Sequence, residues 1–378
     1  MTERILVSGY YGFGNTGDEA ILASIAQHLG KAGELVVLSA NPRHTALEHK
    51  VRAISRLDLP AIARELGRAA LFVSGGGGLL QDATGPGSVP YYAGLLKMAQ
   101  WRRVPTMLLG AGIGPLGTSL GQALTRMAAS RCRVCAVRDD QSARILQALG
   151  VEPARIAVTA DTVLALDPAA PERVDELLAR GGVDLGHAPA IGVAIRPWPT
   201  WFERQFKAFS AVLAQVAARE GAQVLLIPFQ RPHDDRITQE LYDCLQFRPH
   251  SHAPRVTVLT EPMTAAETLG VLGRCGLVFA MRLHALIMAA ASCVPFVGVA
   301  YDPKVEHFAA AWDMPVVLGV EGLEDSRRVE DLVGRMWGQR EVTAGVMRQL
   351  LPRQQDLARQ NFELARQTAG LTGDLQWV

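Results

Sequence analysis

The chain has 378 residues, 49% hydrophobic and 20% charged, and its 38 Lys and Arg against 37 Asp and Glu give a net charge of +1. This length predicts two domains, and balanced charge without a basic tract excludes nucleic-acid binding from the expected functions. Arg282, His284 and Pro295 interrupt the longest apolar stretches, and residues 1–10 contain no signal-peptide core. No membrane-spanning helix is therefore predicted, and a cytoplasmic location is expected.

In the first half of the chain, short β-branched runs alternate with helical stretches, which predicts a parallel sheet covered by helices on both faces. Strands are predicted at 4–8, 34–38, 71–74, 106–109 and 134–137. Helices are predicted at 18–29, 91–102, 120–129 and 139–149.

The same alternation restarts after residues 165–186, which are rich in Pro and Gly and indicate a crossing between domains. Here strands are predicted at 190–195, 223–228, 256–259, 277–280 and 295–299, and helices at 202–219, 234–245, 285–291 and 341–367. The fold class is therefore α/β, with two Rossmann-like domains, a cleft between them and a long C-terminal helix. The predicted boundaries are 1–168 for the N-terminal domain, 169–188 for a linker, 189–338 for the C-terminal domain and 339–378 for a helical tail.

The five cysteines include a C-x-x-C pair, Cys132 and Cys135, a spacing found in redox and metal sites. No second Cys or His pair at zinc spacing follows, so buried reduced thiols are the favoured interpretation for all five. The sequence also contains no H-x-x-x-H or D-x-D arrangement, and neither a metal nor a cofactor is expected.

Three predicted strands are followed by glycine-rich loops, at 9–18, 75–78 and 110–114. Such loops let backbone N–H groups approach an anionic ligand at the carboxyl ends of parallel strands, and Gly76 and Gly77 are candidate binding residues. The first loop contains G-x-G-x-x-G, but the acidic residue of a dinucleotide site is misplaced, since Glu34 begins its strand. Asp18 either favours the helix macrodipole or accepts a hydrogen bond from a sugar hydroxyl.

Residues 281–304 carry the clearest candidate site. Arg282 and His284 follow one predicted strand, and Lys304 follows the next. Adjacent parallel strands end at the same edge of a sheet, so these groups are expected to converge. Arg138 and Arg196 also follow strands, which together predicts a site for a small, strongly anionic ligand carrying phosphate and carboxylate.

Trp198 and Trp201 lie close to Arg196 in the sequence. Their rings could stack on a sugar, but packing of the inter-domain helix is the favoured interpretation.

Five linked motifs resemble the polysaccharide pyruvyl transferase family, and most closely its CsaB-type bacterial members. They are Gly-Tyr-Tyr-Gly-Phe-Gly-Asn-Thr-Gly-Asp-Glu-Ala at 9–20, Ser-Gly-Gly-Gly-Gly-Leu-Leu-Gln-Asp at 74–82, Val-Arg-Asp-Asp-Gln-Ser at 137–142, Arg-Leu-His-Ala at 282–285 and Tyr-Asp-Pro-Lys at 301–304. The resemblance covers about residues 4–310 and implies a GT-B-like fold.

The resemblance also implies the reaction, in which pyruvate passes from phosphoenolpyruvate to two hydroxyls of a sugar and forms a cyclic ketal. The implied acceptor is N-acetylmannosamine in an undecaprenyl-diphosphate-linked cell-wall polymer precursor, at the inner membrane surface, and the ketal later anchors S-layer proteins. The residues implied are Arg138, His284 and Lys304 for the donor, with Asp18 and Arg56 near the acceptor.

In this scheme His284 is the general acid and base, and Arg138, Arg282 and Lys304 hold the carboxylate and the phosphate. Two alternatives remain open. A nucleotide-sugar glycosyltransferase with the same fold would commonly carry glutamates where this chain has Arg-Leu-His. A non-catalytic module that binds an anionic metabolite would need only Arg and Lys, without a titratable His.

Overall fold

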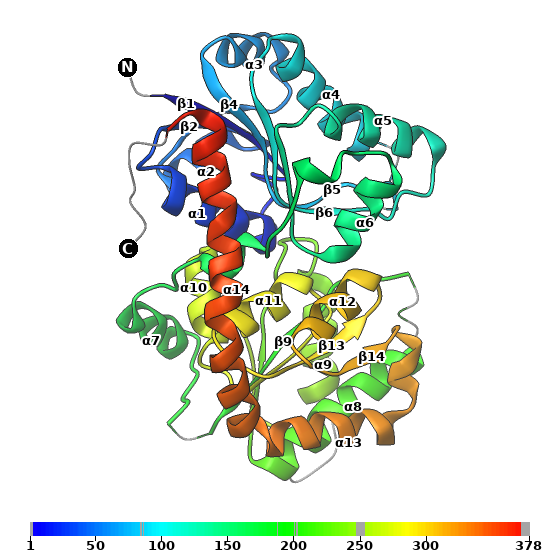
Figure 1. The fold of residues 1–378 in the computed structure, drawn as a ribbon. Coiled ribbons are helices and arrows are strands. Elements are labelled where there is room, and N and C mark those ends of the chain that lie inside the picture. Colours follow the sequence, from blue (N-terminus) through cyan, green and yellow to red (C-terminus); the bar gives the residue numbers. More distant parts are fainter. Residues whose placement is uncertain are drawn as a thin grey trace. The chain divides into compact units, whose positions relative to one another are not determined.

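The computed structural model describes residues 3–83, 85, 87–186, 188–199, 201, 203–246 and 254–371. The chain forms two compact units (Figure 1). Unit 1 comprises residues 1–13, 18–166 and 353–378, and unit 2 comprises residues 14–17 and 167–352. Each unit has its own sheet and its own core.

Unit 1 is built on a parallel sheet to which eight of the described strands contribute, in the order β3-β2-β1-β4-β6-β7-β8 with β5 beside β6. The strands are β1 Arg4–Ser8, β2 Glu34–Ser39, β3 Arg52–Ser55, β4 Ala69–Ser74, β5 Gly77–Leu80, β6 Thr106–Ile113, β7 Val134–Val137 and β8 Ile156–Val158. The helices are α1 Thr16–Leu29, α2 Pro42–His49, α3 Leu59–Leu66, α4 Ser88–Trp101, α5 Ser119–Ala129 and α6 Asp140–Ala148. The central strands are almost continuously apolar because helices cover both faces of the sheet.

Two of the predicted glycine-rich loops of unit 1 are partly strand. The prediction of a loop at 110–114 is wrong, because β6 continues through Ile113. Gly110 takes a φ of +57°, which only glycine adopts readily, and the register with β7 shifts there, so the strand bulges and continues. At 75–78 the chain likewise resumes as β5 from Gly77, which has a φ of +81°.

Unit 2 is built on a second parallel sheet, whose described strands run in the order β11-β10-β9-β12-β13-β14. The strands are β9 Ala190–Ala194, β10 Gln223–Leu226, β11 Val256–Val258, β12 Leu277–Ala280, β13 Phe296–Ala300 and β14 Val316–Leu318. The helices are α7 Pro171–Arg180, α8 Glu203–Glu220, α9 Asp235–Gln246, α10 Ala265–Leu272, α11 Leu283–Ala291, α12 Pro303–Ala311 and α13 Ser326–Gly338. Phe209 of α8 packs against Phe279 of β12 at 4.9 Å between ring centroids, and burying each ring contributes roughly 1.5–3 kcal/mol.

The boundary regions differ in detail from the predicted domain limits. Residues 169–188, predicted as a linker, lie in unit 2, where α7 buries Val174, Leu177 and Leu178. The long terminal helix α14 spans Arg340–Ala369, and its residues from 353 onward belong to unit 1. Phe202, the predicted start of a helix, and residues 372–378 of the predicted tail lie outside the described residues.

The five cysteines are not all buried as predicted. Cys132, Cys135 and Cys275 are buried, whereas Cys244, near the end of α9, and Cys293, after the end of α11, are partly exposed. Within the described parts of the chain, no disulfide joins them, and no helix is long and apolar enough to cross a membrane.

Candidate active site

The candidate residues of unit 2 follow neighbouring strands at one edge of its sheet. Strand β12 pairs in parallel with β13 on one side and with β9 on the other, which confirms the predicted adjacency of the strands before His284 and Lys304. Arg196 follows β9, and Arg282 and His284 follow β12. His284 is the second residue of α11 rather than part of a preceding turn, because the helix begins at Leu283.

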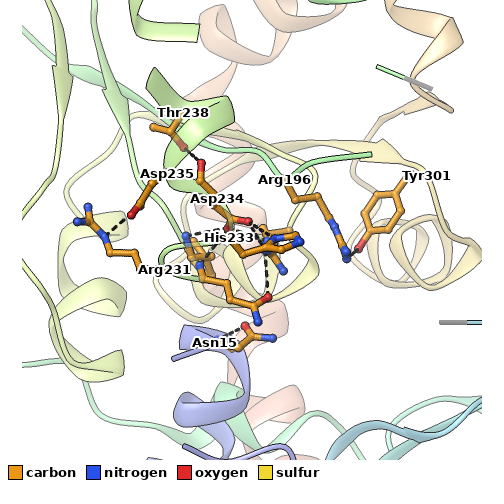
Figure 2. Close-up of polar contacts among 12 residues, drawn as sticks. Asn15, Arg196, Arg231, His233, Asp234, Asp235, Thr238 and Tyr301 are labelled. Atoms are coloured by element: carbon orange, nitrogen blue, oxygen red, sulfur yellow. Dashed lines mark hydrogen bonds and ion pairs between the residues drawn. The ribbon is translucent and has the colours of Figure 1, made fainter. Parts of the chain in front are cut away.

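Arg282 is held by a buried carboxylate that the sequence did not indicate. Its guanidinium bonds both carboxylate oxygens of Asp234, with Nε 3.0 Å from Oδ2, and only 7% of Arg282 is exposed. Asp234 is completely buried and also accepts the backbone N–H groups of Phe229 and Gln230. Figure 2 shows Asp234 with Thr238, whose hydroxyl donates to the Asp234 carbonyl. The carboxylate of Asp234 thus joins the loop after β10 to the start of α11.

The loop after β10 in turn holds the segment 14–17. Thr16 donates its N–H to the Phe229 carbonyl at 2.8 Å, and Asn15 forms an isolated antiparallel β-bridge with Gln230. Gly17 then packs directly on the His284 ring, since a Cβ at residue 17 would lie 2.3 Å from Nδ1. The backbone at Gly17 thus limits the positions open to the imidazole.

Arg196 is the cation at this edge whose donors are least satisfied. Its guanidinium lies over the rings of Trp198 and Tyr301, at 5.5 and 5.4 Å from their centroids, and its Nη1 is 3.5 Å from the Tyr301 hydroxyl. Its buried Nε has no hydrogen-bond partner among the described residues, and no described carboxylate pairs with it. Trp198 therefore flanks the cation, while Trp201 packs on Phe209 of α8.

Lys304 lies beside the same aromatic ring but is paired. Its Nζ is 3.1 Å from Oδ2 of Asp302 and 5.7 Å from the Tyr301 ring centroid. Asp302 also caps α12 by accepting the Lys304 N–H. One carboxylate thus fixes both the helix start and the ammonium group.

Arg138 belongs to unit 1, where it follows β7. Its Nη1 is 3.0 Å from Oδ2 of Asp161, and its guanidinium lies so close to Gly112 that a Cβ there would be 2.8 Å from Nη2. The pairing makes Arg138 a fixed cation with only 9% of its side chain exposed.

Asp18, Gly76 and Gly77 lie together at the carboxyl edge of the unit 1 sheet. Asp18 is buried at the start of α1, and its Oδ1 would be 3.1 Å from a Cβ at Gly77. A Cβ at Gly76 would lie 3.2 Å from the Gly110 carbonyl oxygen and 3.3 Å from that of Leu109, so there is little room for a side chain. Burial raises the pKa of nearby Tyr92, Arg56 opposes that shift, and Asp18 adds to it.

Arg56 lies among aromatic rings in unit 1. Its guanidinium is 4.2 Å from the Tyr91 ring centroid and 5.1 Å from that of Phe13, and its carbonyl accepts the Tyr91 hydroxyl. Cation–π contacts of this kind orient a guanidinium without neutralising it.

Sequence patterns alone did not indicate the acidic partners Asp161, Asp234 and Asp302. The rule that identified Arg282 applies equally to Asp234, because β10 pairs in parallel with β9 and the loop after β10 reaches the same edge. In the described residues, no group of three or more His, Cys, Asp or Glu side chains is arranged to hold a metal ion.

The chain matches the family model of the polysaccharide pyruvyl transferases over residues 15–303. No curated protein matches the sequence. Similar solved structures include a putative UDP-N-acetylglucosamine 2-epimerase from Listeria monocytogenes, with a TM-score of 0.67 at 14% identity, covering 99% of this chain and 98% of that chain. The S. aureus MnaA-UDP structure has a TM-score of 0.68 at 9% identity, covering 98% of both chains.

Anabaena HepE in complex with UDP-glucose is also similar, with a TM-score of 0.61 at 12% identity, covering 97% of this chain and 98% of that chain. At these identities the likeness shows the fold alone, two α/β units of the GT-B-like type. The family model covers well over half of the sequence, so the chain belongs to the polysaccharide pyruvyl transferase family and is a pyruvyltransferase.

Proposed function

We propose that the pyruvyl donor is phosphoenolpyruvate and that the product is a cyclic ketal on a sugar. In this reaction the C3 methylene gains a proton, C2 bonds to one sugar hydroxyl oxygen, and that hydroxyl loses its own proton. The C2–O bond to phosphate then breaks and inorganic phosphate leaves. The second hydroxyl attacks C2 and loses its proton, which closes the ketal.

The observation that carries the donor assignment is the state of Arg196. Its buried Nε lacks a partner among the described residues, and its guanidinium is held by Trp198 and Tyr301 rather than by a carboxylate. The rings leave the guanidinium charge without a counter-ion, and an anionic ligand would supply one. Arg196 would thus bind the carboxylate or the phosphate of the donor.

His284 is proposed as the general acid and base, since an imidazole that titrates near neutral pH can both give and accept the protons of this reaction. Packing of Gly17 on the ring supports this role, because a proton donor must be held in one orientation. Arg282 and Lys304, and in unit 1 Arg138, would contribute positive potential while their carboxylate partners hold them in place.

The proposed acceptor is N-acetylmannosamine of an undecaprenyl-diphosphate-linked cell-wall polymer precursor, as in CsaB-type enzymes, with the ketal serving S-layer anchoring. Asp18 and Arg56 are proposed to contact this acceptor. Support comes from the aromatic surroundings of Arg56 in unit 1, since sugars bind to aromatic faces. The protein would act in the cytoplasm, in peripheral contact with the membrane.

The test is to supply phosphoenolpyruvate with N-acetylmannosamine-containing acceptors and to follow both phosphate release and the mass of the acceptor. Pyruvyl mass gain with stoichiometric phosphate release is expected. His284→Ala should abolish turnover while phosphoenolpyruvate binding, measured by calorimetry, largely survives. Arg196→Ala should weaken that binding by one to two orders of magnitude, the effect of about 1.5–3 kcal/mol for hydrogen bonds to a charged group. Arg236→Ala, which removes an exposed arginine on α9, is the matched control and should change neither value.

Two outcomes would contradict the proposal. Release of UDP from a UDP-sugar, without reaction of phosphoenolpyruvate, would instead support a glycosyltransferase. Thermal stabilisation by phosphoenolpyruvate without turnover on any acceptor would support an anion-binding module. Substantial activity in His284→Ala would remove the imidazole from the mechanism but leave the donor assignment standing.

A further inference from the structure

Exposed arginines gather at the amino-terminal edge of the unit 1 sheet, opposite to the edge that carries Asp18, Gly77 and Arg138. They lie in three successive helix-to-strand turns, before β4, β6 and β7, and all are exposed: Arg68, Arg102, Arg103, Arg131 and Arg133. We call this group the arginine edge. The arginine edge is not visible as a run of basic residues in the sequence, because its five residues come from three separate segments.

The strand pairing brings these turns together. Strands β4, β6 and β7 are consecutive neighbours in the sheet, joined at this edge by bonds from Phe72 N–H to the Pro105 carbonyl and from Arg133 N–H to the Thr106 carbonyl. Neighbouring strands are about 4.8 Å apart, so the three turns span only about 10 Å of sheet edge. Five guanidinium groups are therefore concentrated on one small surface.

The positive charge of the arginine edge is not neutralised by neighbouring acids. No ion pair joins any of the five to a carboxylate of the described residues. Two acids in adjoining segments are already engaged, Glu65 with Arg4 and Arg52, and Glu152 with Arg155. The surface is thus strongly cationic on a chain whose net charge is only +1.

Large apolar side chains lie beside the arginines. Trp101, the last residue of α4, is 75% exposed, and Met127 in the last turn of α5 is 42% exposed. The ends of these two helices, which run side by side in Figure 1, are joined by a bond of 2.9 Å from Gln100 Nε2 to the Ala128 carbonyl. Trp101 and Met127 therefore project at the same edge as the arginines.

We propose that the arginine edge binds the surface of a membrane containing anionic phospholipid. Arginines contact lipid phosphates, and a tryptophan is the side chain most suited to the headgroup region. A single-stranded nucleic acid would instead call for several stacked aromatic rings along a groove, and this edge presents one. Binding here leaves the opposite edge of the unit 1 sheet uncovered. The inference rests on the membrane contact of the proposed function, but not on the identity of the donor or acceptor.

The test is sedimentation of the full-length protein with vesicles of phosphatidylcholine, with and without phosphatidylglycerol. Binding is expected only with phosphatidylglycerol, and it should weaken as salt rises. Each arginine near an anionic surface contributes about fivefold in affinity, so the combined variant Arg102→Gln, Arg103→Gln, Arg131→Gln and Arg133→Gln should lower the partition coefficient by at least about two orders of magnitude. Trp101→Ala should lower it separately.

The matched control replaces four exposed arginines of unit 2, at Arg327, Arg328, Arg335 and Arg348, with glutamine. It makes the same change in net charge and should retain vesicle binding. Equal loss in both combined variants would show that net charge alone is responsible and would overturn the proposal, as would wild-type binding that ignores phosphatidylglycerol. Stronger binding to single-stranded RNA than to the vesicles would overturn it too. Turnover on a water-soluble acceptor should be the same in all variants, so a failure here is separable from a failure of the proposed function.

Discussion

The packing of Gly17 on His284 makes a sharp prediction for the substitution Gly17→Ala. A Cβ at this position would lie 2.3 Å from Nδ1, 2.5 Å from Cγ and 2.8 Å from Cβ of His284, whereas ordinary contact begins near 3.4 Å. The imidazole or the start of α1 must therefore move by about 1 Å. Displacements of that size at a reacting group lower rates roughly a hundredfold. We expect kcat to fall by about that factor.

Folding should be affected much less than the rate. Alanine is favoured over glycine within a helix by roughly 0.5–1 kcal/mol, which offsets part of the strain. We therefore expect the free energy of unfolding of Gly17→Ala, measured by urea denaturation, to stay within about 1 kcal/mol of the wild type. The assay is phosphate release from phosphoenolpyruvate at saturating acceptor.

Gly345→Ala is the matched control. Gly345 lies in helix α14 of the same unit, and a Cβ there meets nothing within 4 Å. This variant should be as stable as the wild type or slightly more so, with unchanged kcat. Wild-type kcat in Gly17→Ala, alongside an inactive His284→Ala, would refute the claim that this contact orients the imidazole.

Three further predictions concern buried groups. Asp234→Asn should destabilise unit 2 by about 3–5 kcal/mol in urea denaturation, because it leaves the buried Arg282 without its counter-charge, and wild-type stability would contradict the ion pair. Asn361→Leu should cost about 1–3 kcal/mol, because Asn361 accepts the buried Gly110 N–H at 2.8 Å and a leucine leaves that donor unsatisfied. Burial raises the pKa of the Cys275 thiol to about 12, so this group stays protonated as the pH rises through the neutral range. Iodoacetamide at about pH 8 should therefore label the partly exposed Cys244 before Cys275. Rapid native labelling of Cys275 would contradict its burial.

The sequence predicted the edge at which the unit 2 residues lie, and the reason is geometric. Parallel strands all end in the same direction, so a residue that follows a buried apolar run is placed without knowledge of its contacts. That reasoning succeeded for the strands before His284 and Lys304, which are neighbours. It identified Arg196 for the same reason.

The pairing of these residues could not be predicted in the same way. Asp234 and Arg282 are 48 residues apart, and the carboxylate reaches the guanidinium only because the loop after β10 folds back on itself. A local pattern does not encode such a bend. The wrong prediction of a loop at 110–114 has a similar origin. A glycine at 110 is compatible with a loop, but its N–H donates to Oδ1 of Asn361, 251 residues away, and this hydrogen bond holds it within a strand.

The pairing also changes the electrostatic account of unit 2. Three unpaired cations at one edge would repel one another and would need water or counter-ions to remain stable. Instead Arg282 and Lys304 each have a carboxylate, so they are fixed in position and contribute a reduced positive potential. Arg196 alone of these three lacks a carboxylate within the described chain, and aromatic rings hold it without neutralising it. An incoming anion would therefore gain most from Arg196 while meeting paired cations that need no rearrangement. In the proposed reaction, such an arrangement would lower the barrier to phosphate departure.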